Sequence, residues 1–294
     1  MPPDSAASVA RRRAILFVLA SSGSFAVASA LVKAVGPGLP VIEIMLFRNV
    51  VAFLCLLPLV HRAGGWSVLR TRRPLGHLGR TLAGLGGMFS TFYGLAYLPI
   101  AATTALGFAM PLVLALISVP LLNERLTGAR LVTIFAGLAG VLLVVRPWQG
   151  TSGLPLGPTS VVLVGVVAWA LGMVSIRRMG QAGERNITIV TLFALSCSVI
   201  SLLACIPVWV TPALVQWPIL IGVGVVSAAA QLLMTEGYRS GEASMLAPFE
   251  YSAIFYTTAL GWLFWGETLG AWEATGIAVL ILSGLFTWWR EGRS

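Results

Sequence analysis

Two stretches of the chain, "LLNERLTGARLV" (121–132) and "LFWGETLGAWEA" (263–274), decide the fold because each resembles the other. An offset of 143 between them places Glu124 on Glu267. Three further pairs of stretches align with similar offsets and in the same order, and they begin with "SFAVASALVKAVG" (24–36) against "AWALGMVSIRRMG" (168–180). The sequence therefore predicts a unit that occurs twice.

The composition places this duplicated unit in a membrane. The chain is 57% hydrophobic and only 10% charged, whereas an ordinary soluble domain has about 25% charged residues. Too few polar residues are present to coat a water-soluble domain of this length, so lipid must contact most of the surface. The net charge of +9 arises from short basic clusters between apolar runs, which argues against nucleic acid as a partner.

Ten segments are long and apolar enough to cross a bilayer as helices of about 20 residues. We predict them at 13–35, 40–60, 76–97, 100–121, 128–145, 157–178, 186–208, 215–236, 243–265 and 271–290. Most basic residues fall in alternate loops, so the positive-inside rule predicts that both termini are cytoplasmic. The start of the chain also has the features of a secretory signal peptide, but the repeat requires it as the first helix.

Each unit contains five spans, an odd number, and the second unit must therefore enter the membrane upside down. We predict an all-α polytopic membrane protein of two inverted five-helix repeats. Its parts are a cytoplasmic tail 1–12, a first repeat 13–146, an outer linker 147–156, a second repeat 157–290 and a cytoplasmic tail 291–294. Inverted repeats are typical of secondary transporters, in which the substrate site lies between the halves. The alternative is a duplication retained for packing alone.

Charged residues within spans are candidates for function, because a charge at the centre of a span costs at least about 2.5–3.5 kcal/mol on insertion scales. Arg48 and Glu250 both approach the midplane of their spans. We expect them to form an ion pair. The alternative is that Arg48 binds carbonyl groups at a helix end while Glu250 faces water in a cavity, where it would be the candidate proton carrier.

Four further charges lie at the ends of spans. Lys33 and Glu43 lie at the outer ends of the first two spans, where an exposed pair orients helices rather than acting on a substrate. Glu124 and Glu267 follow the fourth and ninth spans, and we predict that each caps the helix that follows it. A role in gating is the alternative for these two glutamates.

Aromatic and polar side chains within spans predict an apolar pocket with a few fixed polar groups, which suits an amphiphilic metabolite with an aromatic body. Phe89, Phe92 and Tyr93 recur at helical spacing and are expected to share one face. Trp169 and Gln231 need hydrogen-bond partners that lipid cannot supply. The full set of cavity candidates is Arg48, Phe89, Phe92, Tyr93, Trp169, Gln231, Tyr238, Glu250 and Tyr251.

Three runs of the sequence resemble the EamA-type ten-helix members of the drug/metabolite transporter superfamily: "FRNVVAFL" (47–54) and the apolar runs 93–144 and 247–284. In that family a proline in the fourth or ninth helix precedes a "GE" or "NE" turn, a position matched here by Pro111 and Pro248. The resemblance implies a central cavity lined by helices one to four and six to nine. It also implies small-metabolite substrates, with the YddG-type exporters of aromatic amino acids most similar in appearance.

The repeat and the resemblance together predict a secondary transporter that exports aromatic or hydrophobic amino acids by alternating access. We expect it in the cell membrane, the inner membrane in a bacterium, as a monomer or homodimer. Import of riboflavin or S-adenosylmethionine is the alternative. The sequence contains no HExxH, GxSxG or P-loop motif, so an intramembrane enzyme is a distant alternative, as is a channel or receptor. We predict no cofactor and no metal site.

Overall fold

The computed structural model describes residues 3–36, 38–110, 113, 116–117, 128–146, 148, 154–240 and 249–291. Three of the predicted site residues, Pro111, Glu124 and Pro248, lie outside the described residues, as does the side chain of Tyr238. The proposed roles of these four residues therefore stay predictions.

The described part of the chain is helical. Its α-helices are α1 (Pro3–Val35), α2 (Val41–Arg62), α3 (Pro74–Tyr97), α4 (Ile100–Gly107), α6 (Gly128–Val145), α7 (Leu156–Gln181), α8 (Asn186–Cys205), α9 (Gln216–Ser240), α11 (Ser252–Trp265) and α12 (Ala271–Glu291). Two short 3-10 helices, η1 (Gly65–Leu69) and η3 (Ile206–Val208), lie in loops. Every predicted span overlaps one of the α-helices.

Five helical segments within the described residues are long and apolar enough to cross a membrane by themselves. They are Arg12–Val35, Val41–Arg62, Leu156–Gly180, Ile187–Val208 and Gln216–Met234. The prediction of an all-α polytopic membrane protein is confirmed. The side of the membrane on which the termini lie stays a prediction.

The packing of the helices follows the repeat. Under the sequence alignment α1 corresponds to α7 and α3 corresponds to α9, and in the structure α1 packs along α9 while α3 packs along α7. Three further pairs, α2 with α8, α4 with α11 and α6 with α12, each join a helix to its own counterpart. A two-fold axis between the repeats produces this pattern, which agrees with two inverted repeats.

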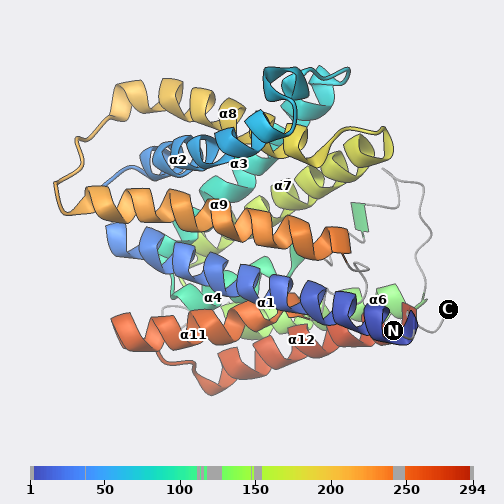
Figure 1. Ribbon diagram of the computed structural model, residues 1–294. Coiled ribbons are helices and arrows are strands. Elements are labelled where there is room, and N and C mark those ends of the chain that lie inside the picture. The colour runs from blue at the N-terminus through green and yellow to red at the C-terminus, as the bar shows by residue number, and fades with distance from the viewer. Residues whose placement is uncertain are drawn as a thin grey trace.

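The bundle is arranged in layers around this axis. Figure 1 shows α2 and α8 on one side, α11 and α12 on the other, and α1 and α9 between them. Helix α1 begins and helix α12 ends at the same end of the bundle (Figure 1). Two apolar clusters hold the layers together: one contains Met45, Leu95 and Leu220, and the other contains Leu106 and Leu280.

The outermost pair, α6 and α12, meets through two glycines. A methyl group added to Gly140 would lie 2.9 Å from the carbonyl oxygen of Gly276, and one added to Gly276 would lie 2.6 Å from that of Gly140. Small residues at such crossings let membrane helices approach closely and gain packing energy. The first and second repeats therefore touch backbone to backbone at this point.

Candidate functional site

Arg48 lies within α2, where this helix meets α3 and α8. Its Nη1 donates to Asn49 Oδ1 at 3.1 Å and lies 3.3 Å from Met88 Sδ. Among the described residues no carboxylate pairs with Arg48, and the predicted Arg48–Glu250 pair is wrong. The reason is packing: Glu250 lies two residues before α11, which packs on α1 and α4, whereas α2 packs on α8, α9 and α3.

A second arginine, Arg80, lies close to Arg48 and was not among the candidates found from the sequence, although it falls within the span predicted at 76–97. Its side chain lies in α3 with only 8% of the residue exposed. The guanidinium carbon lies 3.9 Å from the centroid of the Phe193 ring on α8, a close cation–π contact. Pro74 occupies the first turn of α3 and would have revealed the helix start, which puts Arg80 about two turns inside the helix.

Arg80 has no acidic partner among the residues that the structure describes. Its buried Nε atom makes no hydrogen bond. Arg80 and Arg48 repel one another electrostatically, and both interact with the buried thiol of Cys197 on α8. The two guanidinium groups therefore lie in one region, between α2, α3 and α8.

Gly84 makes room for the Arg80 side chain. A methyl group at Gly84 would overlap both Nη1 of Arg80 and the ring of Phe193. The guanidinium of Arg80 thus reaches the level of Gly84, one turn before Met88, which contacts Arg48. The four residues from Gly84 to Met88 rise about 6 Å, so the two cationic groups are separated by about this distance along α3.

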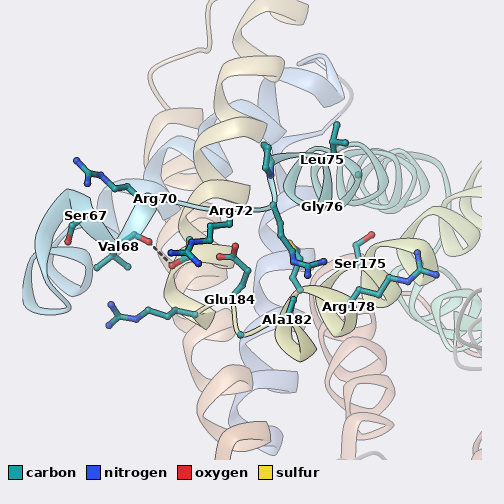
Figure 2. A pocket seen from close by; sticks show the side chains of 17 residues that line it. Ser67, Val68, Arg70, Arg72, Leu75, Gly76, Ser175, Arg178, Ala182 and Glu184 are labelled. Atoms are coloured by element: carbon teal, nitrogen blue, oxygen red, sulfur yellow. Dashed lines mark hydrogen bonds between the residues drawn. The ribbon is translucent and has the colours of Figure 1, made fainter.

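A pocket of about 1080 Å³ opens between the start of α3, the end of α7 and the start of α8 (Figure 2). Five arginines line it: Arg70, Arg72, Arg73, Arg178 and Arg185. Glu184 also lines it, and its Oε1 accepts a 2.6 Å hydrogen bond from Thr71 while its Oε2 lies 3.8 Å from His77 Nε2. The balance of charge around this pocket is strongly positive.

At the opposite ends of these helices, an ion pair joins the two repeats. Lys33 Nζ, at the end of α1, lies 2.5 Å from Glu267 Oε1 and donates to the Leu98 carbonyl oxygen at 2.9 Å. The expected association of Lys33 with Glu43 is therefore wrong. Glu43 is fully buried, and its Oε2 accepts a 3.2 Å hydrogen bond from the backbone N–H of Val210 in the loop between α8 and α9.

Glu267 caps a helix, but a different one from that predicted. Its Oε2 accepts a 2.9 Å hydrogen bond from the N–H of Ile100, the first residue of α4, instead of capping α12. The reason is the chain reversal at Gly266, where φ is +65° and the α11 C-terminus closes with a bond from Glu267 N to Gly261 O. This turn directs the Glu267 side chain back toward the first repeat.

The aromatic candidates divide into separate groups. Phe89 and Tyr93 stack with ring centroids 6.0 Å apart, and Tyr93 meets Tyr97 at 4.6 Å, so a row of three rings follows one face of α3. Phe92 does not share this face, because it is buried in the apolar cluster with Leu95.

The other candidates lie on elements other than α2 and α3. Trp169 on α7 packs over Gly87 of α3, where an added methyl group would lie 2.8 Å from the indole Cε3. Tyr251 forms an edge contact with Phe108 at 4.9 Å, next to Glu250. Gln231 is half-buried on α9. The predicted candidates therefore do not form one cluster within the described residues.

Known proteins share this sequence and architecture. The pseudopaline exporter CntI of Pseudomonas aeruginosa is 28% identical, with 92% of this chain and 93% of the exporter covered. A riboflavin transporter of Vibrio cholerae is 27% identical over 95% and 94%, and an S-adenosylmethionine uptake transporter of Rickettsia bellii is 26% identical over 89% and 88%. One solved crystal structure of 20% identity matches with a TM-score of 0.65 and covers 96% of each chain, which shows the fold alone.

A family model described as the EamA-like transporter family matches residues 12–146 and 159–289, one segment in each half of the chain. The relatives are named as transporters of small molecules, which supports that role and argues against an enzyme. This chain belongs to the EamA-like transporter family and is a multi-pass membrane transporter of small molecules.

Proposed function

We propose that this transporter exports amino acids with aromatic or hydrophobic side chains by alternating access between the two repeats. The row of Phe89, Tyr93 and Tyr97 carries the proposal. Helix α3 turns Gly87 toward α7 and Met88 toward the apolar cluster, so the row occupies a third face. Stacked rings on that face are suited to holding an aromatic body.

The difference between the two ends of the bundle supports alternating access. At one end the Lys33–Glu267 ion pair ties the first repeat to the second. At the other end the pocket lies between α3 of the first repeat and α7 of the second. A transporter closed on one side and open on the other has this asymmetry.

The orientation follows from the charges. Basic residues concentrate on the cytoplasmic side of membrane proteins, so we assign the arginine-lined pocket and both termini to the cytoplasm and the Lys33–Glu267 pair to the outer side. In this assignment the protein is open to the cytoplasm. The first repeat then extends over 13–146 and the second over 157–290, as the sequence predicts.

The direction and substrate rest on comparison and chemistry together. The relatives include a protein named as an exporter, which supports export. They also include a riboflavin transporter and an S-adenosylmethionine uptake transporter, so these compounds form the second candidate group. Glu250 next to Tyr251, and Trp169 against α3, are assigned to the walls of the transport path in this proposal.

Counterflow in proteoliposomes tests the proposal. Vesicles loaded with unlabelled phenylalanine, tryptophan or leucine are expected to accumulate the labelled amino acid transiently and saturably. Phe89→Ala is expected to reduce counterflow of phenylalanine and tryptophan more than counterflow of leucine, because it removes a stacking partner. Accumulation of riboflavin or S-adenosylmethionine, with no response to the amino acids, would reject amino-acid export in favour of the second candidate.

A further inference from the structure

The region between α2, α3 and α8 contains the guanidinium groups of buried Arg80 and half-buried Arg48, and no balancing carboxylate among the described residues. Arg80 contributes a cation over Phe193, and Arg48 contributes a cation beside Asn49 and Met88. Their mutual interaction is repulsive. A buried charge is normally paired, because removing it from water without compensation is costly. Two such charges together call for an anion that is not part of the described protein.

The pocket lies at the start of α3, the same helix that carries Arg80 and that contacts Arg48 through Met88. Gly76, Gly79 and Ser175 line the pocket, and Arg80 directly follows Gly79. From Gly76 to Met88, which contacts Arg48, α3 rises about 18 Å, or roughly half the thickness of a bilayer. Guanidinium groups are therefore found at the pocket, at Arg80 and at Arg48, in order of increasing depth.

We propose that Arg80 and Arg48 together bind the acid group of the transported molecule, and that the preferred substrates are organic anions with a net negative charge rather than zwitterions. Guanidinium groups bind carboxylates through paired N–H donors, and two of them accommodate one carboxylate without a compensating cation on the ligand. An α-ammonium group on the substrate would meet two like charges. This inference rests on the proposed transport function, and it shifts the preferred substrate from the free zwitterionic amino acid to net-anionic derivatives with the same apolar body.

Three compounds with the same phenyl body isolate the effect of charge. N-acetylphenylalanine carries one net negative charge at neutral pH, phenylalanine has no net charge, and phenylalaninamide carries one net positive charge. Binding is measured in detergent as a shift of the thermal unfolding midpoint, because a ligand that binds only the native state stabilises it by mass action. We expect N-acetylphenylalanine to bind most tightly, phenylalanine more weakly and phenylalaninamide most weakly.

Substitution of Arg80 tests the residue directly. Arg80→Gln is expected to lower the affinity for N-acetylphenylalanine by about tenfold or more, because a charged hydrogen bond is lost. The affinity for phenylalanine is expected to fall by less. Without ligand the variant is expected to unfold at the same or a higher temperature, because an uncompensated buried charge has been removed. Arg80→Lys is expected to keep part of the preference for the anion. Arg62→Gln, at the exposed end of α2 and outside the pocket, is the matched control.

Several results would overturn the proposal. Equal midpoint shifts with the three compounds, or no shift with any of them, would remove the charge preference. Unchanged N-acetylphenylalanine binding in Arg80→Gln, or a ligand-free variant that unfolds well below the wild type, would assign Arg80 to structure alone. A shift with phosphatidylglycerol but not with N-acetylphenylalanine would assign the site to a lipid headgroup. Binding is read without transport, so failed counterflow of phenylalanine would reject the proposed function separately.

Discussion

Replacing Glu267 with glutamine is expected to loosen the closed outer end of the bundle. The glutamine oxygen can still accept from Ile100, but Lys33 loses its charged partner at 2.5 Å and keeps the Leu98 carbonyl oxygen and the Trp265 ring, whose centroid lies 5.7 Å from Nζ. The two side chains are 14% and 18% exposed, so solvent screens the pair only in part. The loss is about 2 kcal/mol, which shifts the ratio of closed to open outer ends about 30-fold.

Labelling of a single cysteine measures this shift. Ala102, one turn inside α4 at 2% exposure, is changed to cysteine in a protein whose native cysteines have been replaced. The native cysteines are Cys55, Cys197 and Cys205. A membrane-impermeant maleimide is then added to intact cells. We expect Glu267→Gln to raise the labelling rate by up to about 30-fold, because labelling follows the fraction of molecules that are open.

The pair formed by Arg146 and Glu273 supplies the matched control. These side chains meet at 2.8 Å where α6 ends and α12 begins, in the peripheral helix pair. We expect Glu273→Gln to lower thermal stability without raising the labelling rate at residue 102. Equal labelling in Glu267→Gln and in the parent protein, with both folded, would refute the role of Glu267 in holding the outer end closed.

Two glycine substitutions are expected to separate the binding region from the supporting helices. Gly84→Ala should displace Arg80 and so lower the transport rate at a fixed substrate concentration. The overpacking should also cost about 1–3 kcal/mol of stability. Gly107→Ala is the control and should have neither effect, because its methyl group would meet no atom within 4 Å. Gly276→Ala should cost a similar amount through its contact with the Gly140 carbonyl oxygen and leave the KM unchanged. Thermal unfolding and initial counterflow rates measure both, and an unchanged rate in Gly84→Ala or a changed KM in Gly276→Ala would contradict the assignments.

The architecture was predictable because it depends on properties that are local or periodic in the sequence. The apolar runs are long enough to span a bilayer, and their order repeats, so helices such as α2 and α8 were anticipated to within a few residues. The span predicted at 76–97 contains Arg80, but so near its start that this arginine was not counted as a charge deep within a span. Moving the helix start two residues toward the N-terminus, to Pro74, puts that arginine clearly inside the helix.

The side-chain pairings were not predictable in the same way. Glu43 and Lys33 lie close in sequence, but each has its main partner in the second repeat, at Val210 and Glu267 respectively. These partners depend on how the two repeats pack and on the left-handed backbone conformation of Gly266. Neither feature leaves a periodic signal in the sequence, so nearness along the chain suggested the wrong pair.

The backbone contact between Gly140 and Gly276 has a consequence for engineering. It joins two helices that are counterparts under the repeat, so it lies close to the axis that relates the halves. When the two repeats exchange conformations, α6 takes the arrangement that α12 had and α12 takes that of α6. The crossing between the two helices is therefore unchanged. Substitutions that strengthen this crossing would therefore raise heat resistance equally in both states, without favouring either direction of the cycle.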